Sequence, residues 1–416
     1  MPNGNWILGD LFEKEYGHRG SIQKLWETRW KMPCQRSVYP FHDGNFSDFE
    51  PIFQHLIAHD INDPYSDDYT NAFLPTARDL VKKARDLSKL GASSKVEHKE
   101  EAKNLYFRAN AVFRLARFPY IGTDLKRAVF EEQKEAYMQG TQLWDVPVEE
   151  VVIPHTHAAN GDSSKIPLYI RHPKGAGPFP TILLITGLDG HRPDNTERTE
   201  EHLRRGWATL ICDIPGTTTD CPANKRDPLS PDRLFSSILD YLTQTPHLDH
   251  TRVIAWGLSA GGYYAIRLAH THGAQLLASV GHGAGTHHYI SAEWLAHVAK
   301  HEYPFGLERA YVQKYGYDDF AQLQARCQDD FSLVSGKGEG VAVVGGGGRS
   351  CRLLLVNGVL DGCMPVEDSL LLAEYGSPKE MRFVRERAHM GYPEANGIVY
   401  PWLEEVMESK RGEVAM

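Results

Sequence analysis

The chain has 416 residues, of which 41% are hydrophobic and 24% are charged, a balance typical of globular proteins. Its formal net charge of −9 argues against a nucleic-acid partner, because nucleic-acid-binding surfaces concentrate Lys and Arg. No apolar run approaches the roughly 18 residues of a membrane-spanning helix, and the N-terminus has no signal-peptide pattern, so we predict a cytoplasmic protein without an integral membrane segment.

Residues 1–145 show helical periodicity and no strand-like alternation. Between residues 97 and 118 the apolar positions recur at steps of three and four, which places them on one face of a helix. Pro75 precedes a second helical pattern at residues 76–90, and a third runs over about 123–143. We therefore predict a helical N-terminal domain over residues 1–145, acting as a lid or a dimerisation element.

From about residue 146, short runs rich in Val, Ile and Leu alternate with helical patterns. The first two runs are close enough for a hairpin, and the later ones are continuous apolar runs, typical of parallel strands covered on both faces. This pattern predicts an α/β domain over residues 146–416 with an eight-stranded, mostly parallel sheet. The predicted strands are residues 148–153, 166–171, 180–186, 207–213, 252–257, 276–281, 352–356 and 381–385.

The segment between the sixth and seventh predicted strands, about residues 282–350, is too long for a simple crossover. Its first part is rich in aromatic residues, and we expect a helical insertion there, before the penultimate strand. Residues 336–348 are rich in glycine and predict a mobile surface loop. A phosphate-binding loop would need a strand-to-helix context that this stretch does not have, and its role stays open.

The stretch "VIAWGLSAGGYYA" places Ser259 between Gly257 and Gly261. A G-x-S-x-G pattern alone is weak evidence, but here a predicted strand precedes the serine and a helical pattern follows it. That context is typical of a nucleophile elbow, in which small neighbours permit a sharp turn. The turn would also direct the backbone N–H of Ala260 at a negative charge on a bound carbonyl oxygen. We predict Ser259 as a nucleophile rather than a structural turn residue.

A serine nucleophile needs a base, and the base needs an acid that orients it. Asp361 follows the seventh predicted strand and His389 follows the last one, in the chain order that this type of site requires. An aspartate beside glycine is also a common turn former. Glu367 and Asp368 are rival acids, although they resemble first-turn residues of the next helix.

The loop after the third predicted strand reads "TGLDGHRPDN" and has glycines that allow close backbone approach. We expect its Leu188 N–H to be the second oxyanion donor, with the N–H of Asp189 as the alternative. The side chains of Asp189, His191 and Asp194 either touch substrate or are solvated loop residues.

Three histidines, His282, His287 and His288, stand close together in "GHGAGTHHYI". No carboxylate or cysteine lies at ligand-like spacing around them, and hydrolysis by a serine triad needs no metal. We therefore predict neither a metal nor another cofactor.

The chain resembles the fungal yellowish-green pigment hydrolases of the dihydroxynaphthalene-melanin pathway, a branch of the α/β-hydrolases. The resemblance spans nearly the whole length and includes the N-terminal segments "WILGDLFEKEYGHRGSIQKLWETRWK" and "SVYPFHDGNFSDFEPIF". The segments "GLSAGG", "NGVLDG" and "AHMG" fall where that family carries its triad. The resemblance thus implies an α/β-hydrolase fold with Ser259, Asp361 and His389 as nucleophile, acid and base.

The same resemblance implies a substrate class. Members of this family shorten an aromatic polyketide, a heptaketide naphthopyrone or an acylated naphthalene, by carbon–carbon bond hydrolysis to 1,3,6,8-tetrahydroxynaphthalene. The alternative is a carboxylesterase or lactonase that acts on an aromatic polyketide or another secondary metabolite. Similarity to bacterial pseudooxynicotine-type hydrolases implies a substrate-binding glutamate, for which Glu293 is the candidate. A homodimer is expected by resemblance alone, and association with endosomes is left open.

Overall fold

The computed structural model describes residues 6–89, 96–159, 161–218, 221, 223, 225, 227–298, 300–338, 340–375, 377 and 379–409. The chain forms two compact units. One comprises Met1–Glu15, Glu150–Arg192 and Thr199–Met416, and the other comprises Tyr16–Glu149 and Pro193–Arg198. We call them the sheet unit and the helical unit. Their division near residue 149 lies close to the expected boundary, but each unit also holds a short segment that the sequence assigned to the other.

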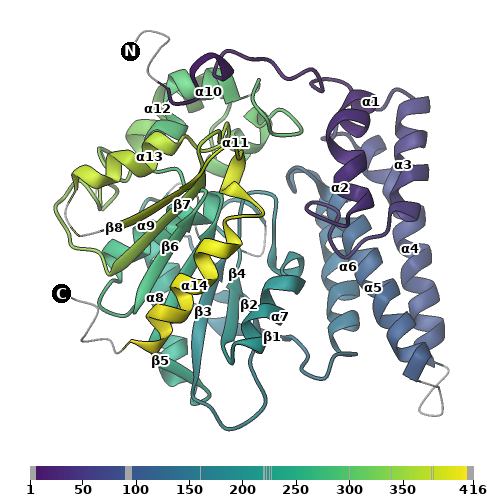
Figure 1. The fold of residues 1–416 in the computed structure, drawn as a ribbon, viewed down its shortest axis with the longest axis horizontal. Coiled ribbons are helices and arrows are strands. Elements are labelled where there is room, and N and C mark those ends of the chain that lie inside the picture. The colour runs from purple at the N-terminus through teal and green to yellow at the C-terminus, as the bar shows by residue number, and fades with distance from the viewer. Residues whose placement is uncertain are drawn as a thin grey trace. The chain divides into compact units, whose positions relative to one another are not determined.

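The sheet unit contains one eight-stranded sheet in the order β1-β2-β4-β3-β5-β6-β7-β8 (Figure 1). β2 pairs with β4 antiparallel, and every pairing from β4 through β8 is parallel. This confirms the predicted fold class, because continuous apolar runs form the buried central strands. The strands are β1 Glu149–Pro154, β2 Lys165–Arg171, β3 Phe179–Ile185, β4 Ala208–Cys212, β5 Leu248–Leu258, β6 Ala278–His282, β7 Arg352–Gly358 and β8 Lys379–Val384.

Helices cover both faces of this sheet, with α14 in front of the strands and α9 behind them in Figure 1. The expected insertion before the penultimate strand is present and is helical. The α-helices of the sheet unit are α8 Ser230–Gln244, α9 Ala260–Thr271, α10 Ala292–Val298, α11 Glu308–Tyr315, α12 Phe320–Phe331, α13 Val366–Leu371 and α14 Asn396–Glu408. The first residues of α7 Thr196–Arg204 belong to the helical unit and the rest of it belongs to the sheet unit.

The glycine-rich stretch is attached to the rest of the sheet unit by buried valines and by hydrogen bonds. Val341 and Val344 are buried, each with 1% of the residue exposed, and the N–H of Val344 donates to the carbonyl of Leu333 at 2.9 Å. Arg267 donates to the carbonyl of Gly340 at 2.8 Å. Two valines among the glycines therefore anchor this stretch, whereas residues 345–348 are exposed at the surface, as expected, and their mobility stays a prediction.

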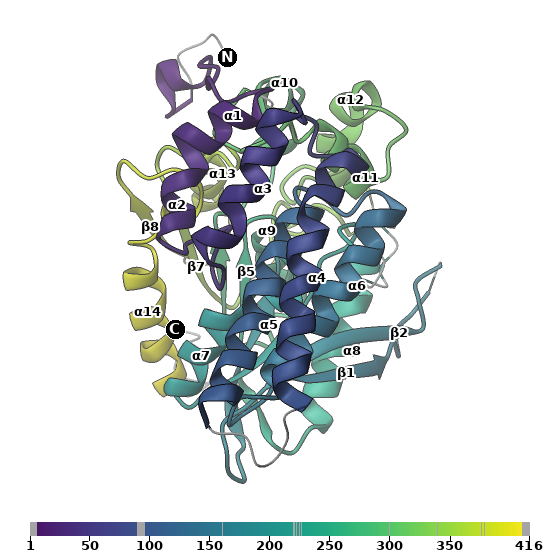
Figure 2. The ribbon, with the colours of Figure 1, turned by 90° about the vertical axis from the view of Figure 1, so that its right-hand side faces the viewer.

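The helical unit is built around three long helices, α4 Asp67–Lys89, α5 Val96–Arg117 and α6 Asp124–Thr141, which run side by side in Figure 2. Thr123 caps α6 by accepting the N–H of Lys126, as its position in the sequence predicts. Pro75 does not begin its helix but lies inside α4. Shorter helices complete the unit: α1 Ile22–Leu25, the π-helical turn Trp26–Trp30, α2 Lys31–Gln35 and α3 Phe46–Ala58.

No helix in the described part of the chain is both long and apolar enough to cross a membrane.

Candidate active site

Ser259 occupies a sharp turn between β5 and α9. Its φ of 54° and ψ of −122° lie in a region that non-glycine residues rarely adopt. The turn requires glycine on both sides. A Cβ added to Gly257 would lie 2.2 Å from the carbonyl oxygen of Gly261, and one added to Gly261 would lie 2.2 Å from that of Thr186. The G-x-S-x-G pattern thus reflects backbone crowding, and it leaves the serine side chain at the carboxyl end of the sheet.

Two other loops at the same edge of the sheet bring His389 and Asp361 to this serine. The Oγ atom of Ser259 lies 2.8 Å from Nε2 of His389, and Nδ1 of His389 lies 2.7 Å from Oδ2 of Asp361. A carboxylate only accepts hydrogen bonds, so Nδ1 carries the proton and Nε2 is left to accept the hydroxyl proton of Ser259. The three side chains therefore form one continuous hydrogen-bonded chain.

The Asp361 carboxylate is held in place by its own loop. Its Oδ1 atom accepts the backbone N–H groups of Cys363 at 2.7 Å and Met364 at 2.9 Å, and its side chain is fully buried. The rival acid Asp368 faces a different segment, where it accepts the backbone N–H groups of Thr286, His287, His288 and Tyr289. Glu367 accepts the N–H of Ile7. Neither rival carboxylate contacts His389.

The loop after β3 lies against the nucleophile. A Cβ added to Gly187 would meet the Leu258 carbonyl oxygen at 3.2 Å and the Cβ of Ser259 at 3.4 Å. Within the described residues, the N–H groups of Leu188 and Ala260 donate to no protein acceptor. Backbone donors of this kind beside a nucleophile are suited to bind an oxyanion.

The polar side chains of this loop lie against other residues of the protein. Asp189 accepts the hydroxyl of Tyr303 at 2.6 Å. His191 is buried, with Nδ1 3.6 Å from Oδ1 of Asp213. Asp194 is buried in the helical unit, where it binds Arg114 and Arg117. His191 and Asp194 are therefore not solvated loop residues, and Asp189 is half-buried.

A carboxylate that the sequence did not reveal touches two loops of the site. The Oε1 atom of Glu302 accepts the N–H of His389 and the N–H of Gly362, both at 2.9 Å. Glu293, the expected substrate-binding residue, is exposed on α10 and accepts the indole N–H of Trp6 at 3.1 Å, and its role stays a prediction. Glu302 lies between α10 and α11 in a segment without a motif, so no spacing signal could have identified it.

The charges of Asp361 and Glu302 shift the pKa of His389, and Asp361 and His389 in turn shift the pKa of Glu302. Burial lowers the pKa of His389, but the Asp361 carboxylate and the charges of Glu302 and Asp189 outweigh burial and raise the pKa above its ordinary value. Burial, together with the negative charge of Asp361, raises the pKa of Glu302 to about 7, although His389 and two backbone N–H groups oppose this. The protonation state of His389 and that of Glu302 therefore depend on each other.

Two of the three histidines of the "GHGAGTHHYI" stretch have separate side-chain partners. Nε2 of His282 lies 2.7 Å from the Met390 carbonyl oxygen, and Nδ1 of His287 lies 2.8 Å from Oγ of Ser332. Within the described residues, the side chains with metal-ligand spacing are Asp361, Cys363 and His389. Because two of them form the hydrogen-bonded chain with Ser259, a metal there would compete with that chain.

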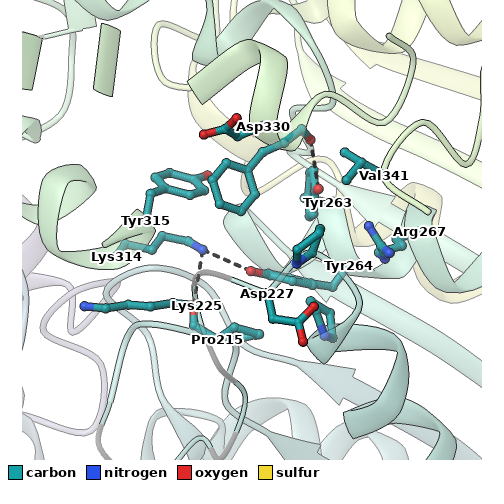
Figure 3. A pocket seen from close by; sticks show the side chains of 13 residues that line it. Pro215, Lys225, Asp227, Tyr263, Tyr264, Arg267, Lys314, Tyr315, Asp330 and Val341 are labelled. Atoms are coloured by element: carbon teal, nitrogen blue, oxygen red, sulfur yellow. Dashed lines mark hydrogen bonds between the residues drawn. The ribbon is translucent and has the colours of Figure 1, made fainter. Parts of the chain in front are cut away.

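A small cavity that does not include Ser259 is lined in part by α9, the helix that follows this serine (Figure 3). It has room for about one water molecule, with a volume of about 20 Å³. Nζ of Lys314 donates to the Tyr264 hydroxyl at 3.1 Å and to the Pro215 carbonyl at 3.3 Å. Burial lowers the pKa of Lys314 to about 8. Ser259, His389 and Asp361 do not line this cavity, so it is not the acyl-binding site.

Comparison with known proteins places the chain in a family. A family model described as "Esterase FrsA-like" matches residues 87–407. The chain belongs to the FrsA-like esterase family. Esterase FrsA from Citrobacter koseri and from Salmonella paratyphi B are each 28% identical to it over 190 residues, 45% of this chain and 44% of each relative. The match thus spans less than half the length of these curated relatives.

Solved structures with a similar fold support the α/β-hydrolase assignment. The crystal structure of 2,6-dihydroxy-pseudo-oxynicotine hydrolase has a TM-score of 0.64 at 19% identity and covers 84% of this chain and 89% of its own. AbyA5 has a TM-score of 0.59 at 17% identity and covers 80% of this chain and 91% of its own. At these identities the likeness establishes the fold and not a substrate.

Proposed function

We propose that the protein is a serine hydrolase that works through an acyl-enzyme on Ser259. The observation that carries this proposal is the continuous chain from Ser259 Oγ through His389 to Asp361, with separations of 2.8 Å and 2.7 Å. His389 would accept the hydroxyl proton while Ser259 attacks a carbonyl carbon. The N–H groups of Leu188 and Ala260 would bind the oxyanion, at about 3 kcal/mol of transition-state stabilisation for each donor.

For the substrate, we propose an aromatic polyketide that carries a side-chain ketone. After Ser259 adds to that ketone, collapse of the tetrahedral intermediate breaks the bond to the ring carbon, which leaves with the electron pair as an enolate. Protonated His389 then delivers its proton to the leaving group. Water hydrolyses the short acyl ester of Ser259, releasing a carboxylic acid and, for a heptaketide, 1,3,6,8-tetrahydroxynaphthalene.

Two arguments support carbon–carbon hydrolysis. The N-terminal and triad segments resemble those of fungal pigment hydrolases that perform this reaction. A polyhydroxylated ring or a β-dicarbonyl carbon also accepts negative charge well enough to leave, so the same machinery that cleaves esters can break this bond.

Ester or lactone hydrolysis is the second candidate, and membership of an esterase family favours it. In that reaction the oxygen leaving group needs no ring stabilisation. The two candidates share the nucleophile, the base and the oxyanion donors, and they differ only in the bond that breaks.

One experiment separates them. The purified protein is incubated with an acyl-naphthopyrone and, separately, with p-nitrophenyl acetate and butyrate, and products are followed by mass spectrometry. Carbon–carbon hydrolysis converts one substrate molecule into a naphthol and a short acid, whereas lactone opening adds one water to a single product. Ser259→Ala serves as the control and should lower kcat by about 10⁴- to 10⁶-fold in either case. Turnover of nitrophenyl esters alone would contradict the carbon–carbon proposal, and an active Ser259→Ala would contradict both.

A further inference from the structure

Asp213 directly follows β4 and binds both ends of the loop that contains Leu188. Its Oδ1 atom accepts the hydroxyl of Thr186, at the start of the loop, at 3.1 Å. The same oxygen accepts the backbone N–H of Arg192, at the end of the loop, also at 3.1 Å. Its Oδ2 atom accepts Nη1 of Arg192 at 2.8 Å. One carboxylate thus fixes the two points between which residues 187–191 run.

The position of this loop controls the geometry around the nucleophile. Gly187 contacts the backbone and side chain of the elbow, as described above, and Leu188 is buried with 5% exposure. The carbonyl of Thr186 is also the atom that excludes a side chain at Gly261. Because hydrogen-bond strength falls steeply with poor distance and angle, a small shift of the loop would misdirect the Leu188 N–H.

The carboxylate is a permanent charge and not a titrating group. Burial raises the pKa of Asp213, but the guanidinium of Arg192, the imidazole of His191 beside it and the hydrogen bond from the Arg192 backbone outweigh burial and lower the pKa to about 2. Asp213 is therefore ionised across the working pH range of a hydrolase. Its contribution to the site is geometric.

We propose that Asp213 is a positioning residue for the oxyanion donor: it holds residues 187–191 in the conformation that directs the Leu188 N–H at the reacting carbonyl oxygen. This inference rests on the proposed serine-hydrolase function. Asp213 does not touch the substrate, so its loss should lower kcat while KM changes little.

The sharpest variant is Thr186→Val, which removes one hydrogen bond to Asp213, keeps the side-chain shape and leaves the Asp213–Arg192 ion pair intact. Thr209→Val is the matched control. Thr209 is a buried β-strand threonine with the same 1% exposure, and its hydroxyl lies 2.8 Å from Nδ1 of His202, away from the loop. Asp213→Asn is the stronger change, although it leaves the buried Arg192 without its counter-charge.

Kinetics on a nitrophenyl ester should show kcat lowered by about tenfold in Thr186→Val and by up to about 10³-fold in Asp213→Asn, the loss expected for one oxyanion donor. KM should stay within about twofold, and Thr209→Val should match the wild type in both constants. A trifluoromethyl ketone, which forms a tetrahedral oxyanion adduct, should lose affinity in parallel with kcat. A wild-type kcat in Thr186→Val, or an equal loss in Thr209→Val, would overturn the inference.

Backbone hydrogen exchange in residues 187–191 gives a readout that needs no turnover. Exchange should be faster in Thr186→Val than in Thr209→Val if Asp213 anchors this loop. Ser259→Ala is measured alongside. An active Ser259→Ala would refute the proposed function and the catalytic role of the anchor, whereas an inactive Ser259→Ala with unchanged exchange and kcat in Thr186→Val would refute the positioning role alone.

Discussion

The backbone N–H of His389 donates to Oε1 of Glu302 at 2.9 Å, while the side chain of the same histidine binds Asp361. The same Glu302 oxygen accepts the N–H of Gly362, the residue after Asp361. One carboxyl group therefore joins the loop of the base to the loop of the acid, and when it is ionised its negative charge lies beside both.

This arrangement predicts a pH effect for Glu302→Gln. The glutamine keeps an oxygen for both N–H groups but removes the charge that stabilises the protonated imidazole. The pKa of His389 should fall, so neutral His389 should persist to lower pH and the acidic limb of the kcat/KM profile should move to lower pH. A pH series of kcat/KM on a soluble ester measures this shift.

Glu293→Gln is the control for that series, because Glu293 is exposed and binds Trp6. Its profile should overlay that of the wild type, and its KM should be unchanged. An acidic limb at the same pH in Glu302→Gln and the wild type would show that Glu302 does not influence the base.

Asp361→Asn should lower kcat by about 10⁴-fold, since an amide N–H facing Nδ1 forces the imidazole tautomer that cannot accept the serine proton. The amide oxygen can still accept the N–H groups of Cys363 and Met364, so the fold should survive. Steady-state kinetics and a melting curve together check this expectation. Asp368→Asn changes the neighbouring buried acid and should lower the melting temperature while kcat keeps the wild-type order of magnitude.

In the helical unit, Asp194→Asn should reduce the free energy of unfolding by about 3–5 kcal/mol, because it leaves two buried guanidinium groups without their shared carboxylate. Asp194 accepts Nε of Arg114 and Nε2 of Gln133, both at 2.8 Å, and also binds Arg117. Glu132→Gln breaks the surface pair with Arg78 and should cost no more than about 1 kcal/mol. Urea unfolding of both variants gives the comparison, and equal losses would contradict a buried-charge origin.

Lys314 predicts a dependence of stability on alkaline pH. Its pKa in the folded protein is about 8, below the value of about 10.4 in an unfolded chain, so the unfolded state binds more protons in this window. The contribution of Lys314 to stability should therefore increase between about pH 8 and 10. Lys314→Met should lose this increase, whereas Lys337→Met, at an exposed position, should retain it. Melting temperatures across the pH series test the difference in slope.

The central strands were predictable because burial on both faces of a sheet demands continuous apolar runs, and each of the eight predicted runs became a strand. Ser259 was recognisable for a related reason: the glycines around it are required by backbone crowding that any such elbow shares. Asp361 and His389 followed from chain order and strand position, and the structure brings both to Ser259.

Glu302, Asp213 and Asp194 were not predictable in their roles. Each acts on residues distant in the chain, and only the fold of the insertion and of the loops brings them together. A carboxylate in a loop looks the same in the sequence whether it is solvated, ion-paired or bound to backbone N–H groups. Pro75 shows the opposite difficulty, because a local helix-start signal lost to the packing of a longer helix.

Neither unit corresponds to one uninterrupted stretch of sequence, and this limits how the protein can be dissected. A fragment starting at residue 150 would lack Trp6 and Phe12, whose rings pack on Trp294 at centroid separations of 4.9 Å and 5.5 Å. A fragment ending at residue 149 would lack Asp194. Chimaeras that exchange the helical unit between homologues must therefore carry residues 193–198 with it and leave residues 6–15 with the host.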